Sequence, residues 1–300
     1  MSGRLRRGTR AAIAVVALVG LIAGASALAE RDGAAAAVEG TVVLLHGLGR
    51  SENNMRILEW RLEARGYRVC NVGYDTRVAT IEDAADEVAR AIAVCEPGIG
   101  PVHFVTHSLG GLVLRALLPR YPDLRPGRAV MLAPPNHGSE IADRLRDLGW
   151  LTAVMGPLAA QLGTRPEDLP KRLPVPSIPF GVIAGDDWIN PAGPLWLPSP
   201  HDGTVSVEST RLEGMRDHIV LPYTHTFIVA AGPVADEVDT FLRRGRFGAE
   251  ERAAEASESC LGGVGIDPLP SAGLVACDAR PGPPRFGGGA GRNDSGSPES

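Results

Sequence analysis

The stretch Pro101-Val102-His103-Phe104-Val105-Thr106-His107-Ser108-Leu109-Gly110-Gly111 decides the fold of this 300-residue chain. Its apolar first half predicts a buried strand, and the apolar run over residues 112–118 predicts a helix. A serine between such a strand and helix is typical of a nucleophile elbow, a turn so sharp that only small residues fit around it. Gly110 fits this pattern, whereas Thr106 stands where the usual pattern has glycine. The alternative is that Ser108 only caps the helix.

A second strand pattern ends in a turn of small residues. Residues 41–45 (Thr-Val-Val-Leu-Leu) predict a buried strand, and His46-Gly47-Leu48-Gly49 follows it. A serine that attacks an ester creates an oxyanion, which preorganised backbone N–H groups stabilise. We expect the amides of Leu48 and Leu109 to be these donors. Taken alone, the segment fits an ordinary glycine turn better.

Two later segments supply an acid and a base. His201-Asp202-Gly203-Thr204-Val205 contains a carboxylate, and Pro222-Tyr223-Thr224-His225-Thr226 follows the strand-like residues 218–221. A serine nucleophile needs a base, and the base needs a carboxylate that fixes its tautomer. Folds that carry such a triad differ in the order in which the three residues follow one another along the chain. The order Ser108, Asp202, His225 is typical of one of these folds.

These segments together resemble an α/β-hydrolase of the bacterial lipase and esterase type. The matching pieces span residues 40–246 and include Leu132-Ala133-Pro134-Pro135-Asn136-His137-Gly138-Ser139. The resemblance implies an α/β fold with a mostly parallel central sheet flanked by helices, and a cap or lid insertion at about residues 138–178. It also implies a serine hydrolase acting on carboxylic esters. Carried over by position, the functional residues are the nucleophile Ser108, the acid Asp202, the general base His225, and the oxyanion-hole donors Leu48 and Leu109.

A second pair of carboxylates competes with Asp202. Asp186 and Asp187 follow a strand pattern over residues 179–185, where many α/β-hydrolases carry their acid. The Pro- and Trp-rich stretch after them is irregular and can return Asp202 to the same strand end. We prefer Asp202 because related lipases hold their acid in the matching segment.

The remaining histidines are assigned no proton transfer. We expect His107 to pack beside the site, His46 to brace the oxyanion loop and His137 to line the pocket mouth. His218, an alternative base, more naturally begins the strand that leads to His225, and His103 and His201 are interpreted as structural. No cofactor is predicted, and no Cys/His cluster or paired-carboxylate spacing indicates a catalytic metal. A structural calcium ion, known in some related lipases, stays an alternative.

The N-terminal residues 1–29 predict export. Four arginines precede an uncharged run over residues 11–29, and Ala27-Leu28-Ala29 fits a cleavage site for a signal peptide. The alternative is an uncleaved membrane anchor, since this run is near the length that spans a bilayer. The four cysteines agree with export, and of their three pairings the spacing suggests a Cys70–Cys95 disulfide in the fold and a Cys260–Cys277 disulfide in the tail. The alternative is that Cys70 and Cys95 are buried free thiols.

The rest of the chain divides into one domain and a tail. Helical patterns over residues 53–65, 81–95, 109–120 and 234–242 alternate with the strand patterns, which predicts a parallel sheet. Residues 247–300 are rich in Gly and Pro and predict a flexible tail. The formal charge of −5 without a basic stripe argues against nucleic acid as a partner.

The substrate is the least determined feature. Residues 148–158, inside the predicted lid, are apolar enough to line an acyl-chain pocket, but a helix packed on the sheet fits equally well. The sequence thus predicts an ester substrate of a lipid-like or aryl kind. An acyltransferase on the same fold and a non-catalytic envelope binding protein are the two alternatives.

Overall fold

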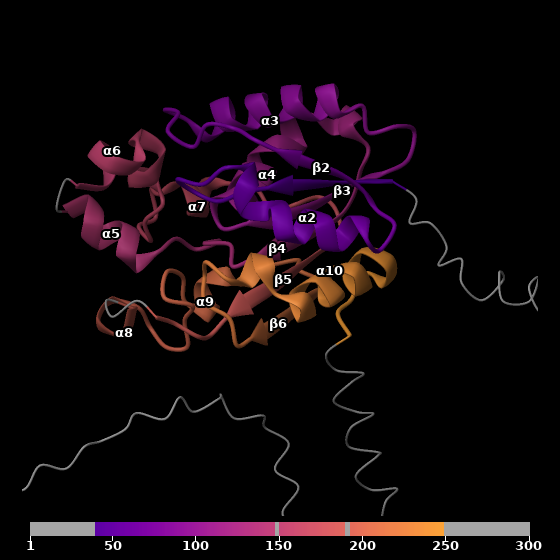
Figure 1. Ribbon diagram of the computed structural model, residues 1–300. Coiled ribbons are helices and arrows are strands. Elements are labelled where there is room, and N and C mark those ends of the chain that lie inside the picture. The colour runs from indigo at the N-terminus through magenta and orange to yellow at the C-terminus, as the bar shows by residue number, and fades with distance from the viewer. Residues whose placement is uncertain (1–39, 148–149, 190–192, 249–300) are drawn as a thin grey trace, which may run out of the picture. The chain divides into compact units, whose positions relative to one another are not determined.

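The computed structural model describes residues 40–147, 150–189 and 193–248, and its sheet has six strands, all parallel, in the order β2-β1-β3-β4-β5-β6 (Figure 1). The strands are β1 (Thr41–Leu45), β2 (Arg68–Val72), β3 (Val102–His107), β4 (Pro126–Leu132), β5 (Phe180–Gly185) and β6 (Asp217–Leu221). Their carboxyl ends are aligned, since Leu45 pairs with Thr106, His107 with Leu132 and Gly185 with Leu221. The loops that follow the strands therefore meet at one edge of the sheet.

Helices cover both faces of the sheet (Figure 1). One apolar cluster joins the sheet to α3 and α4, and the other joins it to α2 and α10. Along β1, Val43 and Leu45 belong to the first cluster, and Val42 and Leu44 to the second. Burial on both faces explains why these strands are continuously apolar rather than alternating. The helices are α2 (Arg56–Glu63), α3 (Ile81–Cys95), α4 (Leu109–Arg120), α5 (Glu140–Asp147), α6 (Trp150–Met155), α7 (Leu169–Arg172), α8 (Gly193–Trp196), α9 (Val207–Thr210) and α10 (Gly232–Arg244).

The predicted fold class, a parallel α/β sheet flanked by helices, is confirmed. The helices predicted over residues 81–95 and 109–120 have the same bounds as α3 and α4. The helix predicted over 53–65 instead begins with a 3₁₀ turn (Glu52–Met55), because the Ser51 side chain caps it and asparagines favour turns over helix interiors. Phe247, placed in the tail by the sequence, packs in the core against Phe241.

The excursion between β4 and β5 carries α5, α6, a 3₁₀ turn (Pro157–Gln161) and α7. Its return to the sheet is held by Arg115 of α4, which is 2 % exposed. The Arg115 guanidinium donates to the carbonyls of Pro170, Leu173 and Pro174 at 3.0, 2.5 and 2.9 Å. Burial lowers the pKa of Arg115 to about 10, so the side chain stays charged at neutral pH. A buried cation therefore fixes one end of the insertion to the helix that follows Ser108.

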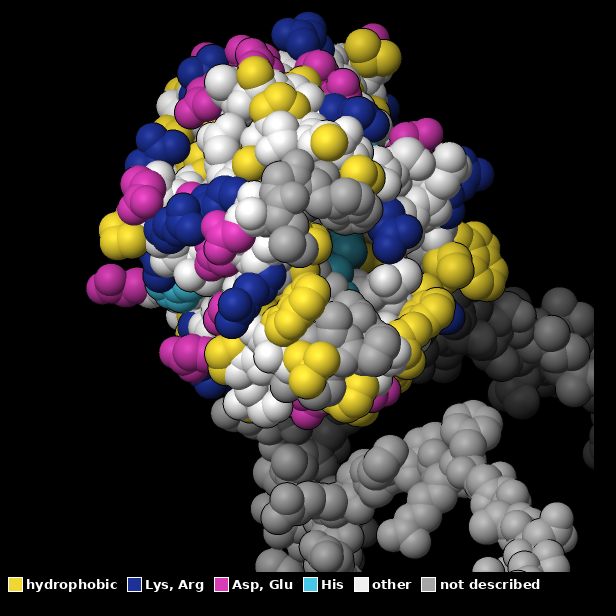
Figure 2. Space-filling view, turned by 90° about the vertical axis from the view of Figure 1, so that its left-hand side faces the viewer, with side chains coloured by type: hydrophobic (Ala, Val, Ile, Leu, Met, Phe, Trp, Pro, Cys, Tyr) yellow, Lys and Arg dark blue, Asp and Glu magenta, His cyan; other side chains and the backbone are white. Residues whose placement is uncertain are grey.

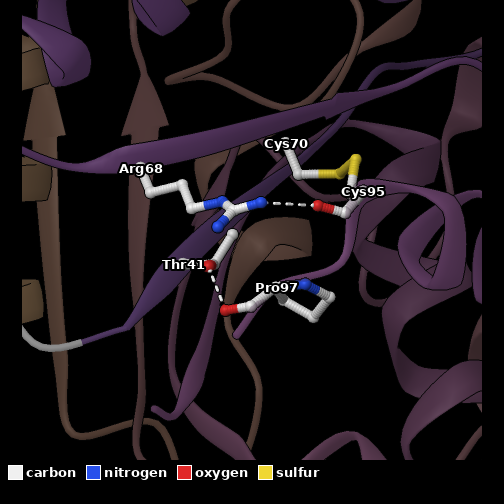
Figure 3. The surroundings of a disulfide bond; sticks show 5 residues. All are labelled: Thr41, Arg68, Cys70, Cys95 and Pro97. Atoms are coloured by element: carbon white, nitrogen blue, oxygen red, sulfur yellow. Dashed lines mark hydrogen bonds between the residues drawn. A yellow bond between two sulfur atoms is a disulfide. The ribbon is translucent and has the colours of Figure 1, made fainter. Parts of the chain in front are cut away.

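The amino-terminal strands are tied to α3 by a disulfide between Cys70 of β2 and Cys95 (Figure 3). The two Cα atoms are 6.1 Å apart, within the usual range for a disulfide. Beside it, Arg68 donates to the Cys95 carbonyl at 2.9 Å and Thr41 donates to the Pro97 carbonyl at 2.6 Å. The cysteine pairing predicted for the fold is thus present.

Other predictions fall outside the described residues. These are the leader or anchor over residues 1–29, nearly all of the tail over residues 247–300, and the pairing of Cys260 with Cys277. Among the residues that the structure does describe, no helix is both long and apolar enough to cross a membrane.

Replacing both Cys70 and Cys95 by serine is expected to destabilise the fold by about 3 kcal/mol, because the disulfide closes a loop and restricts the unfolded chain. Urea unfolding of the oxidised wild type and of the double variant measures the loss. Peptide mapping without reduction is the control and should recover the two cysteines in one linked species. Full alkylation of both thiols in the unreduced protein would contradict the pairing.

Candidate active site

Ser108 lies at the reversal between β3 and α4 and has a strained backbone, with φ 53° and ψ −122°. Its amide donates to the Leu132 carbonyl at 2.9 Å, which holds the turn against β4. A Cβ atom on Gly110 would lie 2.6 Å from the Leu45 carbonyl oxygen. The first turn of α4 can therefore approach the end of β1 only with glycine at this position. The structure places the serine as the sequence predicts, at the top of a strand-turn-helix unit.

Thr106, the departure from the usual pattern, is fully buried two residues before Ser108. A Cβ atom on Gly111 would be at ordinary contact distance from Thr106 Oγ1, 3.4 Å, and would be crowded instead by Pro134 Cβ at 3.0 Å. Within the described residues Thr106 Oγ1 has no hydrogen-bond partner. The turn therefore contains a fully buried threonine where the usual pattern has glycine.

The structure brings His225 and Asp202 to Ser108. His225 Nε2 lies 2.9 Å from Ser108 Oγ, and His225 Nδ1 lies 2.6 Å from Asp202 Oδ2. The carboxylate only accepts, so Nδ1 carries the proton and Nε2 is free to accept from the serine hydroxyl. The chain of hydrogen bonds runs from a carboxylate that is 2 % exposed to a serine that is 8 % exposed.

The Asp202 loop is fixed by its own backbone and by the loop after β4. Asp202 Oδ1 accepts the amides of Thr204 and Val205 at 2.9 and 2.8 Å, and the Asp202 carbonyl accepts the His225 amide at 3.0 Å. Ser139 Oγ donates to the Thr204 carbonyl at 2.8 Å. The carboxylate is therefore oriented before any substrate arrives.

The competing carboxylates do not reach the histidine. Asp186 and Asp187 are exposed, and Asp187 Oδ1 accepts the neighbouring Trp188 amide. A Cβ atom on Gly185 would lie 3.0 Å from Asp202 Cβ and 2.2 Å from the Tyr223 carbonyl oxygen. The irregular excursion after β5 thus returns Asp202 to the end of that strand, as the sequence interpretation requires.

The loop after β1 packs directly against the serine. A Cβ atom on Gly47 would lie 3.1 Å from Ser108 Cβ, and Leu48 lines the cavity in front of Ser108. Leu109, the first residue of α4, has an amide with no acceptor inside the helix. His46 braces this loop: its ring stacks on Tyr74, whose hydroxyl donates to the His46 carbonyl at 2.6 Å.

His107 packs beside the site, as predicted, and also contacts the base's backbone. Its Nε2 donates to the His225 carbonyl at 2.9 Å, and the two imidazole rings are 4.8 Å apart. Burial is the largest cause that holds the pKa of His107 well below its usual value. The side chain is therefore neutral and adds no positive charge next to the His225 ring.

A cavity of about 250 Å³ opens in front of Ser108 and His225. Its walls away from these two residues are mainly apolar and come from the insertion: Ile141, Ala142, Leu145, Met155, Ala159 and Leu162. Figure 2 shows the face that carries α5, α6 and α8, where a histidine side chain lies within a hollow flanked by hydrophobic side chains. The sequence analysis missed α5, although Ile141 and Leu145 have the i, i+4 spacing of one helix face.

Comparison with known proteins identifies the architecture. No family model and no curated protein sequence matches the chain. The mature form of the Bacillus licheniformis lipase BlEst2 superposes with a TM-score of 0.52 at 16 % identity, over 69 % of this chain and 92 % of that one. The chain has the α/β-hydrolase fold. A metagenomic carboxyl esterase is also similar, with a TM-score of 0.49 at 19 % identity, over 65 % of this chain and 67 % of that one.

One histidine of this α/β-hydrolase fold, His137, differs in its surroundings from the expected site. His137 does not line the mouth of the cavity: it lies in a separate cleft, where the Lys171 amine is 3.2 Å from its Nδ1. The backbone explains this, because the His137 amide donates to the Ser209 carbonyl and turns the loop away from Ser108. His218, by contrast, is the second residue of β6, and its Nε2 lies 3.0 Å from Thr210 Oγ1, as expected of a structural residue.

The apolar stretch inside the insertion divides between the cavity and the core. Met155 lines the cavity while Leu158 packs in the core, so the stretch over residues 148–158 serves both suggested purposes. Among the described residues, no group of three or more His, Cys, Asp or Glu side chains is arranged to hold a metal ion.

The lowered pKa values of the buried histidines make the stability of the fold depend on pH. Burial lowers the pKa values of His46, His107 and His218. Below the unfolded histidine pKa of about 6.5 the unfolded chain binds more protons than the folded one, so the free energy of unfolding decreases as the pH decreases. This stabilisation is present above about pH 6.5 and is lost progressively below it.

Urea unfolding at about pH 7.5 and about pH 5 measures that loss. The His107→Gln variant keeps an amide that can reach the His225 carbonyl but has no titrating ring, so it should lose less stability than the wild type between the two pH values. An equal loss in the two proteins would contradict the assignment of a neutral His107.

Proposed function

We propose that this chain is an exported serine hydrolase that cleaves carboxylic esters through Ser108, His225 and Asp202 by way of an acyl-enzyme. The observation that carries the proposal is the continuous hydrogen-bond chain from Asp202 through His225 to Ser108, which ends at a mainly apolar cavity. Such a chain supplies a base for the serine and a carboxylate for the base, which is the arrangement that nucleophilic catalysis by serine requires.

In the first half of the reaction the serine is acylated. His225 Nε2 takes the proton of Ser108 Oγ while that oxygen forms a bond to the ester carbonyl carbon. The carbonyl π electrons move to its oxygen, and the amides of Leu48 and Leu109 donate to the resulting oxyanion. Each such donor contributes roughly 3 kcal/mol of transition-state stabilisation. The bond to the alcohol oxygen then breaks, and the alcohol leaves with the proton that His225 holds.

In the second half water repeats these steps. His225 takes a proton from water as the water oxygen attacks the acyl carbon, and the oxyanion again lies against the two amides. Collapse of this intermediate releases the carboxylic acid and returns the proton to Ser108 Oγ. Asp202 stabilises the imidazolium in both halves without itself taking a proton. A neutral His107 favours the same step, since a second charge on the neighbouring ring would oppose it.

Substrate preference and location extend the proposal. The cavity walled by α5 suits an apolar acyl group, which supports lipid-like or aryl esters as substrates. BlEst2, which shares the fold, is named a lipase, and this likeness supports the same class of reaction for this chain. Export is supported by the basic and apolar residues 1–29 and by the Cys70–Cys95 disulfide, since disulfides persist in oxidising compartments. An uncleaved leader would associate the enzyme with a membrane.

Two other functions are alternatives to ester hydrolysis: one uses the same three residues, and the other uses none of them. An acyltransferase would need Ser108, Asp202 and His225 equally but would pass the acyl group to an alcohol, so product analysis with added alcohol separates it from a hydrolase. A non-catalytic envelope binding protein would not need the hydrogen-bond chain at all. The strained φ of Ser108 favours an enzyme, because such strain is typical of functional sites.

Treating the purified protein with a fluorophosphonate is expected to label Ser108, because this hydroxyl alone is paired with His225 Nε2 at the cavity. Peptide mass analysis locates the adduct, and Ser108→Ala should lose both the label and ester turnover. Ser139, which also lines the cavity, is the matched control: Ser139→Ala should still be labelled at Ser108. A folded wild type without any adduct would favour the binding protein.

Asp202→Asn is expected to lower kcat by about 10⁴-fold, because an amide in place of the carboxylate no longer fixes the tautomer of His225. Asp187 is an exposed carboxylate that does not contact the histidine. Asp187→Asn should therefore change kcat less than twofold, as is typical of a surface substitution. Steady-state turnover of a p-nitrophenyl ester measures both. The reverse pattern would assign the acid to Asp187.

A further inference from the structure

Arg50 holds a position that the mechanism above does not use. It follows the loop that carries Leu48 and lines the cavity in front of Ser108. Its guanidinium lies 3.5 Å from the hydroxyl of Thr226, the residue after His225. Arg50 therefore extends from the loop after β1 to the loop after β6, beside the base and at the open side of the site.

A second cavity, of about 320 Å³, adjoins the first. Both are lined by Arg50 and Met155, and the second is also lined by Arg77 and Thr76. The two cavities differ in character: the walls of the first that come from the insertion are mainly apolar, whereas two arginines and one aspartate line the second. A molecule seated in the first cavity that extends past Met155 would enter a basic environment.

The charge of Arg50 and Arg77 is not neutralised by ion pairs within the described part of the chain, where every salt bridge involves other residues. Asp75 also borders the second cavity, where its Oδ1 accepts the backbone amide of Arg77 at 2.8 Å, so two arginines and one carboxylate leave an excess of positive charge there. The positive charge of Arg50 is felt at the site, since it contributes to lowering the pKa of His107. Arg50 keeps most of its five side-chain donors for a ligand, because the one side-chain hydrogen bond that it makes among the described residues is long, at 3.5 Å.

We propose that Arg50, with Arg77 beside it, binds an anionic group on the alcohol portion of the substrate. The inference rests on the proposed ester hydrolysis and specifies its substrate class: esters with an apolar acyl group in the α5 cavity and a carboxylate or phosphate on the alcohol. The guanidinium fork suits either anion, since both present paired oxygens. We place the anion on the alcohol portion because the cavity walls that come from the insertion are mainly apolar, whereas Arg50 lies beside Thr226 and also borders the second cavity.

A pair of isosteric esters tests this inference: 4-carboxyphenyl butyrate, which is anionic, and 4-carbamoylphenyl butyrate, which is neutral. We expect the wild type to prefer the anionic ester by about tenfold in kcat/KM, the size of one charge-assisted hydrogen bond. Arg50→Gln should bring the ratio close to one, Arg50→Lys should keep part of it, and Arg77→Gln should reduce it. High salt should lower the wild-type ratio, because this site is open to solvent.

The ratio is the readout, so a general loss of activity that affects both esters equally cancels. Arg56→Gln, a substitution of an exposed arginine on α2 that borders neither cavity, is the matched control and should keep the wild-type ratio. A wild-type ratio near one, or a ratio that Arg50→Gln leaves unchanged, overturns the role of Arg50 while ester hydrolysis stands. Absence of turnover of both esters by the wild type overturns the proposed function, and this inference with it.

Discussion

The approach of the first turn of α4 to the end of β1 is the constraint on which the site depends. Gly110 sits against the Leu45 and His46 carbonyl oxygens, where a Cβ atom would clash, and Ser108 takes a positive φ so that the chain can reverse there. This reversal points the serine hydroxyl at His225 and leaves the Leu109 amide at the start of a helix. A helix begun one residue later would separate these groups.

The parallel sheet converts that local turn into a site made from distant parts of the chain. Because the strand ends are in register, the loops after β1, β3, β5 and β6 meet at one edge. His107 joins two of them: it belongs to β3, yet its imidazole donates to the backbone of His225. The loop after β4 completes the arrangement through Ser139, which holds the Asp202 segment from the other side. The base and its carboxylate are therefore fixed by separate strands.

The sequence predicts those features whose causes are local. Ser108 is recognisable because a strand pattern, a serine and small residues are consecutive, and the strands β1, β3 and β5 are buried along their whole length. The choice between Asp202 and Asp187 is different, because it depends on how the loop after β5 folds back past Gly185 onto the Tyr223 backbone. Nothing in the pattern around Arg50 indicates that it borders two cavities, since that depends on Met155, a hundred or so residues later in the chain.

The proposed catalytic residues and the residues that wall the cavity belong to different parts of the fold, and different contacts fix each part. The groups that react in the proposed mechanism stand in loops at the ends of strands, whereas the apolar wall of the cavity belongs to the insertion. Internally, Arg146 joins α5 to Asp168 at 2.6 Å and to the Ala160 carbonyl at 3.0 Å. Externally, Arg115 fixes the segment after α7 to α4, the helix that begins at the serine. Substitutions on the apolar face of α5 can thus change which esters fit without moving Ser108, whereas loss of Arg115 would disturb both.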